Sequence, residues 1–248
     1  MANLGAACAS VDSRREENPD VHDLVAVNRV FNRMTAPERI ACAMQMFPQT
    51  QIMTSSFGAQ SAVSLHMLTL AKPDIPVVLI DTGYLFPETY AFIETMYQRL
   101  DLNLHTYRSV KSPAWQEAQY GERWLQGVEG IEEYNQDNKV EPMQRALREL
   151  GVGTWFTGLR RAQSDSRADT AFVQRSGEYY KVAPLADWTD RDIYKYLQAH
   201  DLPYHPLWEE GYISIGDVHT TRSLLEVGSE EETRFFGLKR ECGLHDLL

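Results

Sequence analysis

Short apolar stretches alternate along the chain with longer stretches in which apolar residues recur every three or four positions. Residues 76–81 form an almost unbroken apolar run, which is typical of a parallel strand buried on both faces. Strands are also predicted at 51–55, 103–107, 154–159 and 179–182. Helices are predicted at 36–47, 62–70, 87–100, 114–125, 140–150 and 189–200. This alternation predicts an α/β fold with a doubly wound, mostly parallel sheet.

Two of the predicted helices begin with a recognisable start signal. Thr35 is followed by Pro37 and Glu38, which together form a capping box with proline near the first helical position. Thr189 and Asp192 have the same spacing before the helix at 189–200. The starts of these helices are therefore the best-defined boundaries in the sequence.

Length and composition indicate a globular protein. The chain has 248 residues, of which 43% are hydrophobic and 24% are charged. The chain contains no run of about 18 apolar residues, so no membrane span is predicted. Residues 1–18 lack the pattern of a signal peptide. We expect a cytoplasmic protein with a disordered tail (1–20), one α/β domain (21–225) and a polar, extended and mobile C-terminal arm (226–248).

The charge of the chain limits its partners. A net charge of −11 repels phosphate backbones and argues against a nucleic-acid partner. An anionic ligand would need a local cationic pocket. The basic residues are 18 Arg and 6 Lys, and arginine binds phosphate and sulfate through paired hydrogen bonds. A bias of the genome towards GC-rich codons would produce the same excess.

Cysteines are few and widely spaced. No CxxC pair occurs among Cys8, Cys42 and Cys242, so the thiolates of one chain cannot form a zinc site or an iron–sulfur cluster. We expect no bound metal and no disulfide framework. Cys8 and Cys42 are interpreted as incidental to function.

Cys242 differs from the other two cysteines in its surroundings. It follows Lys239 and Arg240 and precedes His245, and nearby cations lower the pKa of a thiol and favour the nucleophilic thiolate. Glu241 opposes this effect. A buried structural cysteine is the alternative, but the position in a polar C-terminal segment favours a reactive thiol.

Three further candidate segments lie at predicted strand ends, where open α/β sheets bind ligands. Residues 55–61 are small or hydroxyl-bearing and suit an anion at a helix N-terminus, or form a plain turn. Asp81 ends an apolar strand and either accepts from a ribose hydroxyl or caps the next helix. Residues 158–167 hold three arginines and favour an anion clamp over a solvated charged face.

Together these segments resemble the phosphoadenylyl-sulfate (PAPS) reductase family, thioredoxin-dependent enzymes of assimilatory sulfate reduction. The resemblance covers the chain from about residue 35. It rests on SSFGAQSAVSLH (55–66), DIPVVLIDTGYLFPETY (74–90), NKVEPMQRAL (138–147), TWFTGLRRAQSDSRA (154–168), PYHPLWEEGYISIGDVHTTR (203–222) and ETRFFGLKRECGLH (232–245). It implies a sheet of the adenine-nucleotide alpha-hydrolase-like (PP-loop) type, in which residues 55–61 replace the usual SGGxDS loop.

Two departures from related enzymes narrow the expected function. Adenylyl-sulfate (APS) reductases carry the cysteine ligands of an iron–sulfur cluster at four positions, where this chain has Tyr134, Asn135, Asp217 and Thr220. Their absence is typical of the cluster-free branch, whose substrate carries a 3′-phosphate. Gln60 stands where ATP-cleaving loop enzymes carry Asp, which argues against ATP hydrolysis.

The resemblance implies a covalent mechanism. The Cys242 thiolate attacks the sulfur of PAPS, adenosine 3′,5′-bisphosphate leaves, and an S-sulfocysteine remains. An external dithiol, thioredoxin or glutaredoxin, then releases sulfite, so no flavin, metal or nicotinamide is needed. The family's homodimeric state is expected here too.

Motif positions also imply which residues bind the substrate. The nucleotide is assigned to Ser55, Ser56, Phe57, Gly58, Ser61, Asp81, Thr82 and Gly83. The phosphates and the sulfonate are assigned to Lys139, Arg160, Arg161, Arg167, Arg234, Lys239, Arg240 and His245. Three other functions remain as alternatives: an APS-preferring reductase, an ATP-dependent adenylating enzyme of the same fold, and a non-catalytic nucleotide-binding regulator.

Overall fold

The computed structural model describes residues 20–47 and 50–238. Its sheet has six strands in the order β3-β2-β1-β4-β6-β5. Their bounds are β1 (Gln51–Thr54), β2 (Pro76–Ile80), β3 (Asn103–Tyr107), β4 (Thr154–Phe156), β5 (Val173–Ser176) and β6 (Tyr179–Val182). All neighbouring pairs are parallel except β5 with β6. The predicted doubly wound, mostly parallel α/β sheet is confirmed.

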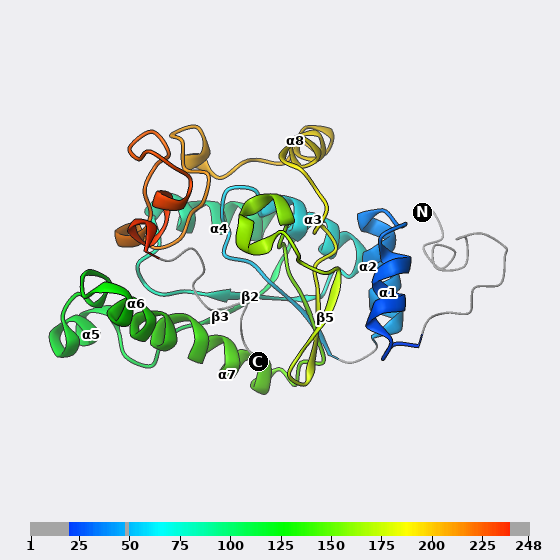
Figure 1. Cartoon of the computed structure of the whole chain (residues 1–248), viewed down its shortest axis with the longest axis horizontal. Helices are drawn as coiled ribbons and strands as arrows, with labels where there is room; N and C mark the ends of the chain where they lie inside the picture. Colours follow the sequence, from blue (N-terminus) through cyan, green and yellow to red (C-terminus); the bar gives the residue numbers. More distant parts are fainter. Residues whose placement is uncertain (1–19, 48–49, 239–248) are drawn as a thin grey trace.

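Helices cover both faces of this sheet (Figure 1). Ile52, Val78 and Trp155 alternate with their strand neighbours and pack on one face, in the core that also holds Met143 and Leu147. The larger core lies on the opposite face. The helices are α1 (Leu24–Phe31), α2 (Ala36–Met46), α3 (Ala62–Ala71), α4 (Pro87–Leu100), α5 (Pro113–Tyr120), α6 (Gly127–Asn135), α7 (Glu141–Glu149) and α8 (Asp190–Ala199).

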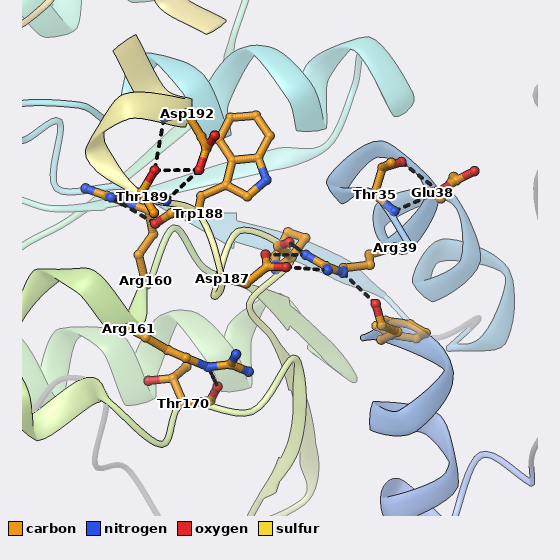
Figure 2. A network of polar contacts seen from close by, with 12 residues as sticks. Thr35, Glu38, Arg39, Arg160, Arg161, Thr170, Asp187, Trp188, Thr189 and Asp192 are labelled. Carbon is orange, nitrogen blue, oxygen red and sulfur yellow. Dashed lines mark hydrogen bonds and ion pairs between the residues drawn. The ribbon is translucent and has the colours of Figure 1, made fainter. Parts of the chain in front are cut away.

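Both predicted start signals form as the spacing requires. At α2, the Glu38 carboxylate accepts a hydrogen bond from the Thr35 amide at 2.7 Å, and this contact lowers the pKa of Glu38. At α8, Asp192 accepts from the Thr189 amide at 2.9 Å. Figure 2 shows both caps. The helix boundaries that these signals fix agree with the prediction.

Three elements are absent from the sequence-based prediction. The helix α1 is capped by Asp23, whose side chain accepts from the Ala26 amide. The strand β5 is an antiparallel edge strand of four residues, too short for a clear alternating pattern. The helix α6 continues through a π-helical turn (Gln136–Val140) into α7. A π turn shifts the apolar face out of register, so the periodicity of α6 does not extend that of α7.

The expected C-terminal arm is not extended where the structure describes it, at residues 226–238. A 3-10 turn forms at Glu231–Thr233, a turn with positive φ follows at Phe235–Gly237, and Thr233 and Phe235 are fully buried. The high proportion of polar residues concealed this because a few buried side chains are enough to fix a short segment. Within the described residues, no helix is long and apolar enough to cross a membrane.

Candidate active site

A cavity of about 350 Å³ opens at the carboxyl ends of the parallel strands. Its wall includes Thr54 at the end of β1, Thr82 after β2 and Gly158 after β4. Nine of the residues assigned from the sequence line it: Ser55, Ser56, Gly58, Ser61, Thr82, Lys139, Arg160, Arg167 and Arg234. This volume is within the usual range for a small-molecule site. The strand-end location expected from the fold is therefore where these side chains meet.

The turn at 55–61 leads from β1 into the N-terminus of α3. The Phe57 amide donates to Ser55 Oγ at 3.1 Å, and Ser61 Oγ donates to the Gly58 carbonyl at 2.9 Å. These contacts fold the chain tightly and place the positive end of the α3 dipole at the cavity. Phe57 itself is fully buried in the larger core and does not line the cavity. Its expected place at the nucleotide is therefore corrected to a packing role.

Arg160 and Arg161 leave the loop after β4 in different directions (Figure 2). Arg160 donates to the Trp188 carbonyl at 3.1 Å, contacts Gln60 and pairs with Asp190 at 2.9 Å. Arg161 donates to the Thr170 carbonyl at 2.9 Å and lies outside the cavity wall. The expected phosphate role of Arg161 is not supported by this geometry, because its guanidinium is held by the backbone elsewhere.

Lys139 lies on the π turn between α6 and α7. Its neighbour Asn138 is fully buried and exchanges hydrogen bonds of 2.8 and 2.9 Å with Gln116 of α5. This contact fixes the turn. The Lys139 ammonium forms an ion pair of 2.7 Å with Asp217. The backbone of Lys139 is therefore fixed by the π turn, and its ammonium is fixed by Asp217.

Asp217 is buried but remains ionised. Its side chain is 1% exposed and accepts a hydrogen bond of 2.5 Å from Thr82 Oγ1. Burial alone would raise its pKa, but the charge and hydrogen bond of Lys139, together with the Thr82 hydroxyl, lower the pKa to about 2. The ionised carboxylate therefore balances the charge of the Lys139 ammonium at neutral pH.

The four positions at which APS reductases carry cluster cysteines are all buried here. Tyr134, Asn135, Asp217 and Thr220 are each at most 3% exposed. Both side-chain polar atoms of Asn135 and Thr220 Oγ1 have no hydrogen-bond partner among the described residues, whereas the Tyr134 hydroxyl interacts with Thr82 and Asp217. Buried polar atoms of this kind usually bind ordered water.

An aromatic group packs against this buried polar region. The His219 ring stacks on Trp124 with centroids 3.8 Å apart and meets Tyr84 and Tyr134 edge to face. Burial lowers the pKa of His219 to about 4. A neutral imidazole therefore lies behind the Lys139–Asp217 pair at neutral pH, and it adds no competing charge there.

Asp81 and Gly83 have structural roles and do not line the cavity. The Asp81 carboxylate accepts from the Gly83 amide at 2.8 Å, from Tyr90 Oη at 2.8 Å and from Arg108 Nε at 2.8 Å. Gly83 has a positive φ of 78°, and a Cβ there would lie 2.6 Å from Pro113. Both were expected near the adenosine, but the Asp81 carboxylate is already bound by the Gly83 amide, by Tyr90 of α4 and by Arg108 after β3.

Arg234 reaches the cavity from the C-terminal segment. It donates to Ser214 Oγ at 3.2 Å, and its guanidinium lies so close to Gly216 that a Cβ there would be 2.4 Å from Nη2. Glycine at 216 is required for this close approach. Four other assigned residues fall outside the described part of the chain: Lys239, Arg240, Cys242 and His245.

Comparison with known proteins agrees with this arrangement. Residues 50–223 match the profile of the phosphoadenosine phosphosulfate reductase domain. A phosphoadenosine 5'-phosphosulfate reductase from Xanthomonas campestris pv. campestris (strain B100) is 61% identical over 92% of this chain and 95% of its own length. The chain belongs to the phosphoadenosine phosphosulfate reductase family. A reductase of the same name from Xylella fastidiosa (strain 9a5c) is 58% identical over 92% of this chain and 96% of its own length.

Solved structures support the same family and fold. The phosphate complex of the PAPS reductase from Candida auris has a TM-score of 0.72 at 28% identity, covering 83% of this chain and 99% of that one. The FMN adenylyltransferase from Candida glabrata has a TM-score of 0.58 at 17% identity, over 92% of this chain and 72% of that one. The second likeness shows the fold alone, which the two proteins share over most of this chain.

Several residues of the cavity wall had no site role predicted from the sequence. Asp190 and Gln60 hold Arg160, and Asp217 holds Lys139. In the sequence, Asp190 was recognisable only as the first residue of a capped helix. Asp217 was noted only because APS reductases carry a cysteine at its position. The sequence signal that could have identified Asp217 is its position as the one acidic residue in the otherwise uncharged stretch 211–220. Its partner Lys139 lies 78 positions earlier, so no local pattern could predict the pair.

Proposed function

We propose that this enzyme reduces PAPS to sulfite and adenosine 3′,5′-bisphosphate through an S-sulfocysteine on Cys242, with thioredoxin or glutaredoxin as the dithiol. The main observation behind the proposal is that the expected binding elements line one cavity. It gathers the 55–61 turn, the α3 N-terminus and four cationic side chains at the strand ends: Lys139, Arg160, Arg167 and Arg234. The family membership and the sequence around Cys242 complete the argument.

The reaction divides into two balanced steps. In the first, the Cys242 thiolate forms a bond to the sulfur of the phosphosulfate, the S–O bond to phosphate breaks, and the bisphosphate leaves with the electron pair. In the second, one thiol of the external dithiol attacks the Cys242 sulfur and releases sulfite. The second thiol of the donor then closes a disulfide and restores the Cys242 thiol, so the dithiol supplies both electrons.

Lys139 fits the requirement of the first step. Negative charge grows on the phosphate oxygen as the S–O bond breaks, and a cation fixed beforehand stabilises that charge. The Lys139 ammonium is held in the cavity wall by Asp217 at 2.7 Å, so little reorganisation is needed. Arg234 reaches the same wall from the segment that leads to Cys242.

We propose that the protein holds no resident cofactor. The basis is the chemistry of the four cluster positions, since tyrosine, asparagine and threonine do not replace thiolates as ligands of an iron–sulfur cluster. The described residues also contain no group of three or more His, Cys, Asp or Glu placed to hold a metal ion. A homodimeric, cytoplasmic enzyme remains part of the proposal through its family.

The proposal predicts a preference for PAPS over APS. Each charge-assisted hydrogen bond to the 3′-phosphate contributes about 1.5–3 kcal/mol, so one or two change kcat/KM by roughly 10-fold to 20,000-fold before desolvation is subtracted. The measurement is kcat/KM for both nucleotides with the same thioredoxin at fixed salt. Equal values, or a preference for APS, would refute the substrate assignment.

Arg167 is the residue we expect to read the 3′-phosphate. It lines the cavity and is positioned by a 2.7 Å hydrogen bond to Gln163. Arg167→Ala should therefore reduce the ratio of kcat/KM for PAPS to kcat/KM for APS. Arg161→Ala is the matched control, since this arginine belongs to the same loop but bonds to Thr170 outside the cavity wall, and the ratio should stay unchanged.

The adenylating alternative is disfavoured by the contacts of Gln60. Its amide nitrogen donates to Asp190 at 3.2 Å, and its carbonyl accepts from Arg160. The side chain therefore serves to hold an arginine, whereas ATP-cleaving loop enzymes have a carboxylate at this position. Release of pyrophosphate from ATP would favour that alternative over PAPS reduction.

A further inference from the structure

The C-terminal segment contains three consecutive residues with a left-handed backbone. The φ angles are 45° at Phe235, 57° at Phe236 and 76° at Gly237. Glycine adopts this region freely, but bulky residues rarely do, and they remain there only where their surroundings compensate for the strain. Two adjacent phenylalanines in this conformation therefore indicate a turn that other contacts hold in place.

The contacts around Phe235 explain what holds the turn. Phe235 is fully buried, and its ring centroid lies 5.0 Å from the Lys139 ammonium. The Tyr134 ring lies 5.3 Å from the same ammonium, so Lys139 contacts two aromatic rings and the Asp217 carboxylate. A cation near an aromatic face is attracted to it, most strongly where water is excluded.

The backbone on the N-terminal side of Phe235 is also anchored. The Arg222 amide donates to the Thr233 carbonyl at 2.9 Å, and Arg234 forms an isolated antiparallel bridge with Thr221. Arg234 additionally contacts Ser214. The segment is therefore docked along the loop that forms one wall of the cavity, and Phe235 is its last fully buried residue within the described part of the chain.

The length of chain beyond this anchor is short. Cys242 lies four residues after Leu238, which covalent geometry limits to about 14 Å. The position of the anchored segment at 235–238 therefore bounds how far the Cys242 thiol can lie from Lys139.

We propose that Phe235 is a positioning residue for the transfer of the sulfonate to Cys242. Its ring, packed on the Lys139 ammonium, fixes the described segment to which Cys242 is tethered, while Phe235 itself contacts no reacting atom. This inference rests on the proposed function, because it assumes that Cys242 receives the sulfonate. Phe236 is a matched control, since it has the same backbone conformation but a side chain that is 37% exposed and lies over Arg222.

The test compares Phe235→Ala with Phe236→Ala in single-turnover reactions of the full chain with PAPS and no reductant. Intact mass over time gives the rate at which one SO3 group appears on the protein. Phe235→Ala should slow this rate by about tenfold or more, while its Kd for adenosine 3′,5′-bisphosphate stays within about twofold of the wild-type value. Phe236→Ala should match the wild type in both quantities.

Three results would overturn the positioning role. They are an unchanged rate in Phe235→Ala, an equal loss of rate in Phe236→Ala, or a loss of bisphosphate affinity in Phe235→Ala that parallels its loss of rate. The last of these would indicate general damage to the cavity. Failure of the proposed function gives a different result, in which the wild-type protein itself acquires no SO3 group on Cys242.

Discussion

Asp217 and Lys139 form a buried ion pair in the wall of the cavity. Their charged groups are 2.7 Å apart, with side chains 1% and 9% exposed. Removing one partner of such a pair leaves an uncompensated buried charge, which costs more than the pair contributes. The pair therefore couples the stability of the fold to the presence of a cation at the substrate site.

Asp217→Asn should lower the free energy of unfolding at pH 7 by about 3–5 kcal/mol. Chemical denaturation measures this loss. Asp201→Asn is the control, because Asp201 is 99% exposed where it pairs with Arg99, and its effect should stay below about 1 kcal/mol. An equally small effect at Asp217 would show that the pair is solvated rather than buried.

The same pair predicts how stability depends on acidity. The pKa of Asp217 is about 2 in the folded state against 3.8 as its ordinary value. As the pH falls, Asp217 is therefore protonated in the unfolded chain before it is protonated in the folded one. About 2 kcal/mol of the free energy of unfolding is present above pH 4 and is lost as the pH falls towards 2. Asp217→Asn should lack this part of the acid dependence.

At the scale of elements, the loop after β6 is anchored to α2. Arg39 donates to both carboxylate oxygens of Asp187 at 2.5 and 2.6 Å and to the Pro184 carbonyl at 2.9 Å, as Figure 2 shows. The next residue, Trp188, supplies the carbonyl that accepts from Arg160. A contact remote from the cavity thus sets the position of a residue in its wall.

Arg39→Ala should destabilise the protein by about 3 kcal/mol, since it removes several buried hydrogen bonds while Asp187 stays 37% exposed. Arg99→Ala removes a surface ion pair and should cost less than about 1 kcal/mol. Denaturation midpoints of the two variants check this difference. Similar midpoints would contradict the assignment of Arg39 as the anchor.

Elements with strong local signals were predictable from the sequence, and those fixed by distant contacts were not. The Thr35 and Thr189 caps and the buried run 76–81 depend on neighbouring residues, so their positions were correct. The roles of Asp81 and Arg161 depend on partners such as Arg108 and Thr170, which only the folded chain brings close. The missed strand β5 is likewise defined by its pairing with β6.

At the scale of the whole molecule, the main contrast is between net charge and site charge. The chain carries −11 overall, yet Lys139, Arg160, Arg167 and Arg234 converge on one cavity. Among the described residues, Asp190, Asp217 and Glu230 also line this cavity, so its four cations against three carboxylates leave a small positive balance in an acidic protein. This arrangement fits a small, highly charged anion as substrate.

The C-terminal segment completes this arrangement. Residues 226–238 are docked beside the cavity rather than extended, and Arg234 and Glu230 line its wall. The sequence indicated the reactive cysteine but not the docking, because burial of Thr233 and Phe235 depends on the distant loop at 211–222. Fold, cavity and thiol-bearing segment therefore converge on one end of the sheet.

The most direct test of the proposed function is the intact mass of the protein after reaction with PAPS in the absence of any thiol donor. The wild-type protein should gain one SO3 group, and thioredoxin should then remove it as sulfite. Cys8→Ser and Cys42→Ser should gain the same group, whereas Cys242→Ser should gain none and still bind adenosine 3′,5′-bisphosphate. An adduct that persists in Cys242→Ser, or a wild-type protein that releases sulfite without ever forming one, would contradict the mechanism.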